Sequence, residues 1–247
     1  MAPSIHRLRM VAGPNGSGKS TVKSFVDSRV ALMWGLYINP DDIEQKMLRS
    51  GQLDLKEFQV TSTSDEIRHF FLHSALLQKE NLTQIAKIIR LHENCLEFEK
   101  KQVNSYLASV IADFIRQKLV EKRCSFTFET VMSSEDKIRF LQHAKTQGYR
   151  TYLYYVATID PALNIDRVRD RVKKGGHDVP RKKIIDRYHR SLEFLLDAIH
   201  QTDRAYIFDN SSQEMIWIAE ITDGRNLEIK NGWIPQWFET AVLKKLH

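Results

Sequence analysis

Residues 13–20 have the types and spacing that bind the phosphate groups of a nucleotide. The segment reads Gly-Pro-Asn-Gly-Ser-Gly-Lys-Ser and fits the pattern G-x-x-x-x-G-K-[ST] with no insertion. Its glycines permit a positive φ and a close approach of the backbone, so that N–H groups can converge on phosphate oxygens. In this pattern the ammonium of Lys19 reaches the β- and γ-phosphates, and the hydroxyl of Ser20 is a ligand of Mg²⁺. We therefore expect ATP and Mg²⁺ as ligands. The expected nucleotide-binding residues are Gly13, Pro14, Asn15, Gly16, Ser17, Gly18, Lys19, Ser20 and Thr21, with Ser20 as the metal ligand.

The residues on either side of this loop agree with the prediction. Residues 8–12 are mostly apolar and indicate a short buried strand, and residues 21–26 carry apolar side chains at helical spacing. A strand, a glycine-rich loop and a helix in this order are the context that a phosphate-binding loop (P-loop) requires. The alternative is a glycine-rich turn that merely precedes a helix, and the strand and helix on either side disfavour it.

Asp41 is the first candidate for chemistry outside the loop. Residues 35–38 predict a second short strand, and Pro40 opens a helix that Gly51 ends. In open α/β sheets, ligands bind beyond the carboxyl ends of the strands, so a carboxylate here can work near the phosphates. The alternative is that Asp41 or Asp42 only caps the helix, and one aspartate can cap while the other is catalytic.

Glu129 and Thr130 follow another predicted strand. Residues 125–128 alternate and are rich in residues that favour strands. A charged residue directly after a buried strand is either part of a site or part of an exposed turn. The sheet-edge argument favours a substrate-binding role for Glu129 and Thr130.

A basic pair of helices follows at about residues 160–190. Arg167, Arg171 and Lys174 fall at helical spacing on one face, and two glycines at 175–176 end the helix before the next one begins. A phosphoryl-transfer site needs cations against the charge of the moving group, and a cationic lid can supply them on closing. The alternative is that these residues only complement the helix dipole or form a solvated face. The double glycine suits a hinge, and His177 beside it is the one histidine that merits attention.

Residues from about 55 to 122 are almost wholly helical in pattern. One helix contains Ile67, Phe70 and Phe71, a second spans residues 82–89, and the longest carries an apolar stripe from Val103 to Ile115. The stripe covers about two heptads, which favours packing within the chain over a coiled-coil partner. We expect a helical insertion beside the site.

The remaining segments complete an α/β fold. Residues 150–157 form a near-continuous apolar and aromatic run typical of a strand buried on both faces. Residues 204–210 predict a last core strand, residues 215–221 and 227–229 a hairpin, and residues 233–246 a terminal helix. We therefore predict a three-layer P-loop fold with a mostly parallel central sheet, a helical insertion and a basic lid. Residues 1–247 are interpreted as a single kinase-like domain.

The composition is ordinary for a globular protein and limits the classes of function. The 247 residues are 42% hydrophobic and 28% charged, with a net charge of +6. This mild basic excess suits an anionic substrate and does not by itself indicate nucleic acid. Two distant cysteines provide no metal or disulfide pattern, and no apolar run is long enough for a membrane span. With no signal-peptide core before the first strand, we expect a cytoplasmic protein.

Four blocks of the sequence in order resemble the zeta-toxin-like P-loop kinases. They are residues 13–20, 38–41, 126–130 and 175–180, and the helix that contains Arg187 and Tyr188 also fits. Zeta toxins are bacterial kinases that phosphorylate UDP-N-acetylglucosamine with ATP and Mg²⁺ and are inhibited by an antitoxin. Two features depart from the family pattern. Ser133 stands near the place where zeta toxins have an arginine, and the helical insertion is longer.

The resemblance implies a role for each candidate residue. Lys19 and Ser20 would bind nucleotide and metal, and Asp41 would be the base that accepts the proton of the substrate hydroxyl. Glu129 would position the substrate, and Arg171 would contact the transferring phosphoryl group. Two other functions use the same core: an ATPase or nucleotide-switched protein whose insertion docks a partner, and a kinase of nucleic-acid ends.

Overall fold

The computed structural model describes residues 5–27, 34–176 and 178–246. The chain folds into two compact units. The first comprises Met1–Gly35 and Glu129–His247, and the second comprises Leu36–Phe128. The boundary falls inside strand β6 (Phe126–Thr130), so that Glu129 and Thr130 belong to the first unit.

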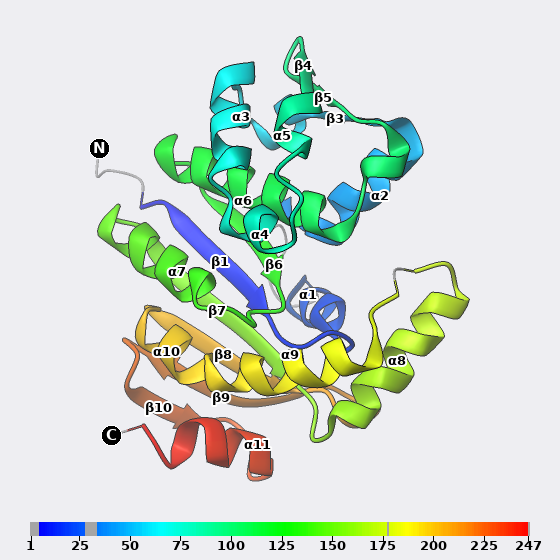
Figure 1. Ribbon diagram of the computed structural model, residues 1–247. Coiled ribbons are helices and arrows are strands. Elements are labelled where there is room, and N and C mark those ends of the chain that lie inside the picture. Colours follow the sequence, from blue (N-terminus) through cyan, green and yellow to red (C-terminus); the bar gives the residue numbers. More distant parts are fainter. Residues whose placement is uncertain (1–4, 28–33, 177, 247) are drawn as a thin grey trace. The chain divides into compact units, whose positions relative to one another are not determined.

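The sheet of the first unit carries the P-loop (Figure 1). Its strands lie in the order β10-β9-β8-β7-β1. Strands β1, β7 and β8 are parallel, whereas β9 and β10 are antiparallel to their neighbours. The strand bounds are Arg7–Ala12 for β1, Arg150–Ala157 for β7, Arg204–Asp209 for β8, Ile216–Thr222 for β9 and Asn226–Ile229 for β10. The predicted α/β fold with a mostly parallel sheet is confirmed.

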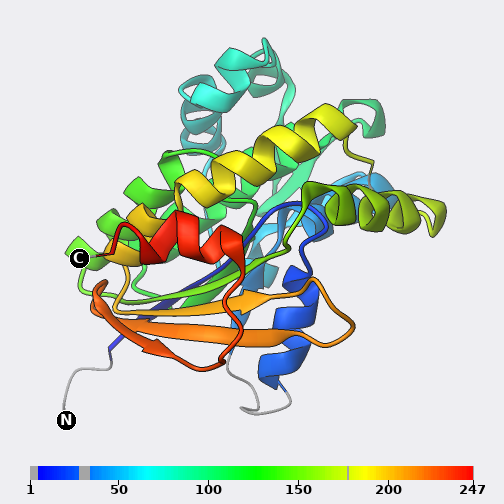
Figure 2. The same cartoon turned by 90° about the horizontal axis from the view of Figure 1, so that it is seen from below.

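Helices cover both faces of this sheet, as Figures 1 and 2 show. Consecutive residues of β7 point to opposite faces. Tyr154 stacks on Tyr206 of β8, whereas the hydroxyl of Tyr155 hydrogen-bonds Ser191 of α9. Burial on both sides explains the near-continuous apolar run in β7. Helix α1 lies on one face, and α7, α9, α10 and α11 lie on the other. Their bounds are Lys19–Asp27 for α1, Asp136–Thr146 for α7, Arg181–Glu193 for α9, Leu195–His200 for α10 and Gln236–Phe238 for α11.

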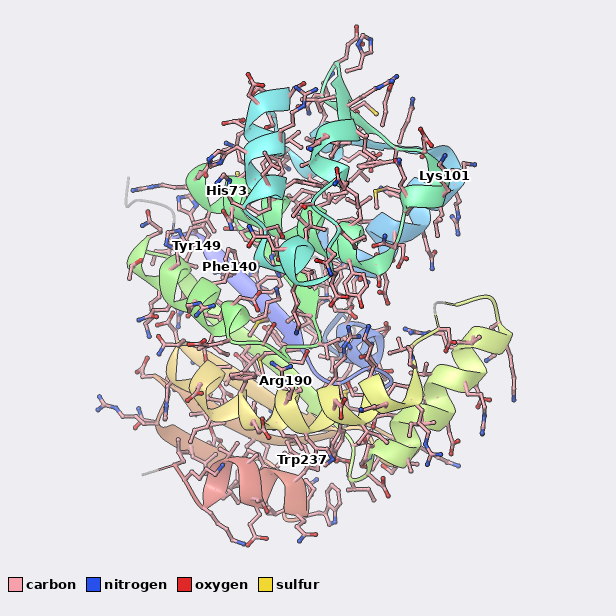
Figure 3. All side chains as sticks on the ribbon, viewed as in Figure 1. His73, Lys101, Phe140, Tyr149, Arg190 and Trp237 are labelled. Carbon is pink, nitrogen blue, oxygen red and sulfur yellow. The ribbon has the colours of Figure 1, made fainter. Side chains whose placement is uncertain are left out.

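The C-terminal segment secures the end of strand β8. Trp237, on α11 in Figure 3, donates its Nε1–H to the buried carboxylate of Asp209 at 2.8 Å. The other oxygen of Asp209 accepts the backbone N–H of Ser211 at 2.8 Å. These two bonds fix the loop that leaves the carboxyl end of β8, where a site can form.

The second unit contains a parallel strand pair and several helices. Strand β2 (Leu36–Ile38) pairs with residues 126–128 of β6. Helix α2 (Pro40–Ser50) packs on the long helix α6 (Ser105–Glu121), which carries the predicted apolar stripe. The short helices are α3 at Ser64–Leu72, α4 at Ala75–Lys79 and α5 at Ile85–Ile88.

The prediction that residues 55–122 are almost wholly helical is wrong for residues 90–97. Strands β4 (Arg90–His92) and β5 (Cys95–Glu97) form a hairpin, and β3 (Gln52–Asp54) pairs with β5. Glu93 and Asn94 both have positive φ, 46° and 73°, as the favoured two-residue hairpin turn requires. The helix expected at residues 82–89 shrinks to α5 because the chain turns into this hairpin.

The basic helical pair has an apolar core of its own. Helix α8 (Pro161–Lys173) packs on α9 through a cluster that includes Val168, Val179 and Ile184. A second tie comes from Tyr188, whose hydroxyl donates to the backbone oxygen of Thr158 at 2.6 Å. The helix predicted to run on from residue 181 is divided into α9 and α10 at Phe194, and His177 lies outside the described residues. No helix within the described ranges is long and apolar enough to cross a membrane.

Candidate functional site

The P-loop joins β1 to α1 in the conformation that its glycines permit. Gly16 and Gly18 have φ values of 76° and 99°, a region that disfavours other residues. A Cβ atom on Gly16 would lie 2.5 Å from the backbone oxygen of Asn164, and one on Gly18 would lie 2.0 Å from Nδ2 of Asn210. Both positions therefore require glycine because the loop is packed tightly against its neighbours.

Side chains from three other segments hold the loop in place. Asn164 of α8 donates from Nδ2 to the backbone oxygen of Asn15 at 2.6 Å. Arg187 of α9 donates to the side-chain oxygen of Asn15 at 3.3 Å. Asn210, after β8, donates to the backbone oxygen of Ser17 at 2.9 Å. These bonds satisfy loop carbonyls from outside and keep the phosphate-facing side of the loop clear.

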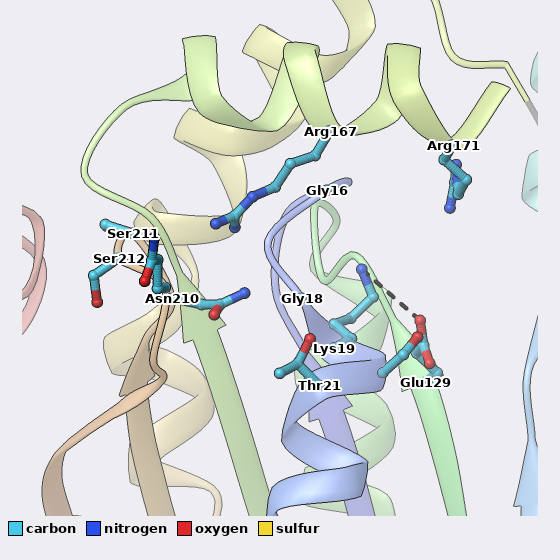
Figure 4. A pocket seen from close by; sticks show the side chains of 12 residues that line it. Gly16, Gly18, Lys19, Thr21, Glu129, Arg167, Arg171, Asn210, Ser211 and Ser212 are labelled. Carbon is cyan, nitrogen blue, oxygen red and sulfur yellow. Dashed lines mark ion pairs between the residues drawn. The ribbon is translucent and has the colours of Figure 1, made fainter. Parts of the chain in front are cut away.

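Lys19 lies at the centre of the site. Its ammonium donates to the backbone oxygens of Gly13 and Pro14, both at 3.1 Å. It also forms an ion pair with Glu129 at 3.9 Å, drawn as a dashed line in Figure 4. Both side chains are largely buried, with exposed fractions of 10% and 12%. The strand-end glutamate predicted from the sequence thus lies next to the P-loop lysine.

Thr130 lies beside Glu129 and has a structural partner. Its backbone oxygen accepts the N–H of Gly13 at 3.3 Å, and its hydroxyl accepts the N–H of Met132 at 3.1 Å. Thr130 therefore ties the end of β6 to the start of the P-loop. This contact helps to fix Glu129 in its place.

A cavity of about 800 Å³ lies over the loop. Two arginines of α8 line it, Arg167 and Arg171, and the loop after β8 closes another side. In Figure 4 the guanidinium of Arg167 extends toward Asn210, whereas Arg171 lies on the side of Lys19. Lys174 is exposed at the end of α8 and does not belong to the lining. The lining residues are Gly16, Gly18, Lys19, Ser20, Thr21, Glu129, Arg167, Arg171, Asn210, Ser211, Ser212 and Gln213.

The double glycine fixes the end of α8 beside Arg171. The N–H of Gly176 bonds the backbone oxygen of Arg171 at 3.0 Å, and the N–H of Gly175 bonds that of Val172 at 2.9 Å. A Cβ on Gly176 would lie 2.5 Å from Cγ of Arg171. Gly175 has a φ of 85° and open space around it. Gly175 thus permits the turn, and Gly176 leaves room for the arginine.

The polar groups of the site fit a polyanion. Oγ of Ser17 and Nη1 of Arg167 are buried and have no hydrogen-bond partner among the described residues. Ser20 lies in the exposed part of the lining. Within the described ranges no three His, Cys, Asp or Glu side chains gather to hold a metal. A magnesium ion here would use one hydroxyl together with substrate phosphates and water, as Mg²⁺ commonly does.

Asp41 belongs to the second unit, in the first turn of α2. Asn39, and neither aspartate, is the N-cap of this helix: its side-chain oxygen accepts the backbone N–H of Asp41 at 2.9 Å. The capping alternative considered for Asp41 and Asp42 is therefore wrong. Asp41 is half-buried and Asp42 is exposed.

The sequence analysis does not identify the loop after β8 as part of the site, although the sequence contains a signal for it. Residues 210–213 follow the carboxyl end of a core strand. The same argument, that ligands bind beyond the carboxyl ends of strands, is the one that predicts a site role for Glu129. Asn164 carried no such signal, because a buried asparagine in a helix acquires its role only through packing against Asn15.

Comparisons with known proteins agree with this geometry. A family model described as "Zeta toxin" matches residues 83–222, which is more than half of the chain. The matched range contains Glu129, both cavity arginines and Asn210, and begins after the P-loop. A comparison with curated protein sequences found no match.

Several solved structures resemble the chain. The crystal structure of AvrRxo1-ORF1:-ORF2 with ATP has a TM-score of 0.56 at 14% identity and covers 93% of this chain. The same complex with sulphate ions has a TM-score of 0.57 at 13% identity and also covers 93%. In both, the match covers 62% of the AvrRxo1 chain, so the present chain spans less than two thirds of it. The PezAT toxin–antitoxin system of Streptococcus pneumoniae gives a TM-score of 0.47 at 12% identity, with coverage of 88% and 73%. At 13–14% identity, the likeness to the AvrRxo1 structures shows the fold alone.

Proposed function

This chain belongs to the zeta toxin family, and we propose that it is a kinase that uses ATP and Mg²⁺ to phosphorylate a hydroxyl group of a small molecule. The observation that carries the proposal is the cavity in which the P-loop, Glu129 and Arg171 meet. The AvrRxo1 structure that resembles this chain was obtained with ATP, which supports ATP as the donor.

On the donor side, the loop amides and Lys19 bind the β- and γ-phosphates. Lys19 now donates to two loop carbonyls, and these neutral acceptors are weaker partners than phosphate oxygens. When the nucleotide binds, the ammonium of Lys19 therefore exchanges these two carbonyl oxygens for phosphate oxygens. Ser20 offers its hydroxyl to Mg²⁺, which neutralises charge on the phosphates when it is bound.

On the acceptor side, we assign Asp41 as the base that takes the proton of the attacking hydroxyl. Glu129 and Thr130 orient that hydroxyl. Glu129 is anchored for this role by its ion pair with Lys19. The carboxylate of Glu129 also gives the substrate hydroxyl a hydrogen-bond partner in a largely buried part of the site. The proton of the hydroxyl passes to Asp41 as the oxygen bonds to the γ-phosphorus and ADP leaves.

Arg171 stabilises the charge on the group in transfer. It lines the cavity on the side of Lys19, and Gly176 leaves it room. Removing a preorganised donor of this kind typically costs about 3–4 kcal/mol of barrier. Arg171→Ala should therefore lower kcat by roughly two to three orders of magnitude, with a smaller effect on ATP affinity.

The family suggests the acceptor and a partner. We propose a nucleotide sugar such as UDP-N-acetylglucosamine as the substrate, and an antitoxin as the protein that restrains the enzyme in the cytoplasm. The mild net charge of +6 suits such an anionic acceptor without favouring nucleic acid.

Product analysis tests the proposal. The protein is incubated with labelled ATP and a panel of nucleotide sugars, nucleosides and oligonucleotides, and mass spectrometry identifies the acceptor that gains one phosphoryl group. A phosphorylated small molecule supports the kinase. Formation of only ADP and phosphate would indicate an ATPase or a nucleotide switch, and a labelled oligonucleotide end would indicate a nucleic-acid kinase.

A further inference from the structure

Different residues line two sides of the cavity over the P-loop. On one side it is lined by Lys19, Glu129 and Arg171, the groups assigned above to phosphoryl transfer. On the other side it is lined by Arg167 and by residues 210–213 after β8. Figure 4 shows the guanidinium of Arg167 extending toward Asn210 and Ser211 and away from Lys19. The two arginines of α8 therefore face different parts of the same cavity.

We infer that Arg167 binds the nucleoside end of the nucleotide by stacking its guanidinium on the base, and that the site accepts either purine. This rests on the proposed function, because it assumes that a nucleoside triphosphate occupies the P-loop. A planar guanidinium stacks well on an aromatic ring, and a purine offers more area for it than a pyrimidine.

Arg167 is available for this role. Its Nη1 is buried and has no hydrogen-bond partner among the described residues. A buried guanidinium N–H without an acceptor is costly, so a ribose oxygen or ring nitrogen of the ligand would accept from Nη1 while the base lies on the face of the guanidinium. Arg169, two residues further along α8, is exposed and pairs with Asp166 at 2.8 Å. Arg169 therefore serves as the matched control on the same helix.

Three polar side chains opposite Arg167 make hydrogen bonds within the protein. Asn210 donates to Ser17 at 2.9 Å, and the hydroxyl of Ser211 accepts the N–H of Ile159 at 2.8 Å. The hydroxyl of Ser212 donates to the backbone oxygen of Glu214 at 2.7 Å. With these three groups committed to fixing the loop and Gln213 exposed, the edge of the base has few rigid partners. Stacking on Arg167, rather than hydrogen bonding to the edge of the base, then sets the preference for purine over pyrimidine nucleotides.

The test is a binding measurement with four nucleotides and one phosphate-only probe. Calorimetry compares ATP, GTP, CTP, UTP and inorganic tripolyphosphate, each with Mg²⁺, on the wild-type protein and on Arg167→Ala, Arg167→Lys and Arg169→Ala. We expect ATP and GTP to bind the wild type with similar affinity and the pyrimidine nucleotides more weakly. Arg167→Ala and Arg167→Lys should each lose on the order of tenfold for ATP and GTP and nothing for tripolyphosphate. Arg169→Ala should match the wild type.

Three results would overturn the inference while leaving the proposed kinase intact. The first is an equal loss of ATP and tripolyphosphate affinity in Arg167→Ala, which would make Arg167 a phosphate ligand. The second is an ATP affinity that does not change in Arg167→Ala. The third is a wild type that binds UTP as tightly as ATP. A wild-type protein that binds neither nucleotides nor tripolyphosphate would instead contradict the proposed function. Thermal unfolding of each variant confirms that it is folded before binding is measured.

Discussion

Replacing Gly176 by alanine tests whether the double glycine acts by making room for Arg171. The added Cβ would lie 2.5 Å from Cγ of Arg171 and 3.0 Å from its backbone oxygen. Ordinary carbon–carbon contacts are about 3.5–4.0 Å, so the arginine must shift by about 1 Å. A misplacement of about this size can cost ~10²-fold in rate. We therefore expect kcat to fall by about two orders of magnitude.

Gly175→Ala is the matched control. At a φ of 85° a Cβ there meets no atom within 4 Å, so the change strains the backbone and leaves Arg171 in place. A left-handed backbone costs a residue with a Cβ roughly 1–2 kcal/mol. Gly175→Ala should therefore lower the thermal midpoint while preserving kcat in the folded protein.

Steady-state kinetics of both variants, with thermal unfolding measured in parallel, decide the matter. The reasoning predicts that Gly176→Ala loses kcat and that Gly175→Ala loses stability. Equal losses of kcat in the two variants would show that the turn acts as a hinge. Full activity in Gly176→Ala, with activity lost in Arg171→Ala, would show that the close contact does not control the arginine.

Three further outcomes follow from contacts in the two units. Asn210→Ala removes the bond to the backbone oxygen of Ser17, so the KM for ATP should rise severalfold, in line with ~1 kcal/mol for one hydrogen bond, while kcat changes little. In the second unit, a hydrogen bond from Ser62 holds the pKa of Glu66 below its usual value. The stabilisation from ionised Glu66 is fully present above the usual glutamate pKa and is lost as the pH falls through the lowered pKa. In acid, the free energy of unfolding of Glu66→Gln should therefore depend less on pH than that of the wild type. Chelation of Mg²⁺ should abolish phosphoryl transfer and only weaken ATP binding, as activity and calorimetry with and without chelator would reveal.

The arrangement around the P-loop could be predicted from the sequence because its signals are local. The P-loop pattern places Lys19 at the start of a helix that follows a buried strand, and the strand before Glu129 specifies the edge of the sheet where that residue stands. The ion pair between Lys19 and Glu129 is the structural consequence of both. Helical spacing likewise indicated that Arg167 and Arg171 share a face, and both line the cavity.

The sequence did not reveal what depends on contacts between distant segments. Asn164 and Arg187 reach Asn15 only because α8 and α9 pack beside the loop. The sequence predicts helix at residues 90–97, where the structure has a hairpin, because the strands are three residues long and the turn lacks glycine. Asn94 accounts for that turn: it tolerates a positive φ, and its side chain bonds the backbone of Val60 and Ser62.

The basic helices that the sequence predicts as a lid pack together as a pair. The apolar cluster around Val168, Val179 and Ile184 joins α8 to α9, so the two helices form one packed hairpin. Buried hydrogen bonds from Tyr188 and Ser191 tie α9 to strand β7 and its exit. A closing motion is therefore expected to involve the end of α8 that bears Arg171 more than α9.

ATP affinity in two variants tests the central assignment most directly. Calorimetry with Mg²⁺ and ATP compares the wild type with Lys19→Ala and Asp41→Ala, while both variants are assayed for phosphoryl transfer. We predict that both lose transfer, that Lys19→Ala binds ATP about 10–100-fold more weakly, and that Asp41→Ala binds it as the wild type does. Equal loss of ATP affinity in the two variants, or transfer that survives in either, would contradict the division of the site into a P-loop that binds the donor and an aspartate that activates the acceptor.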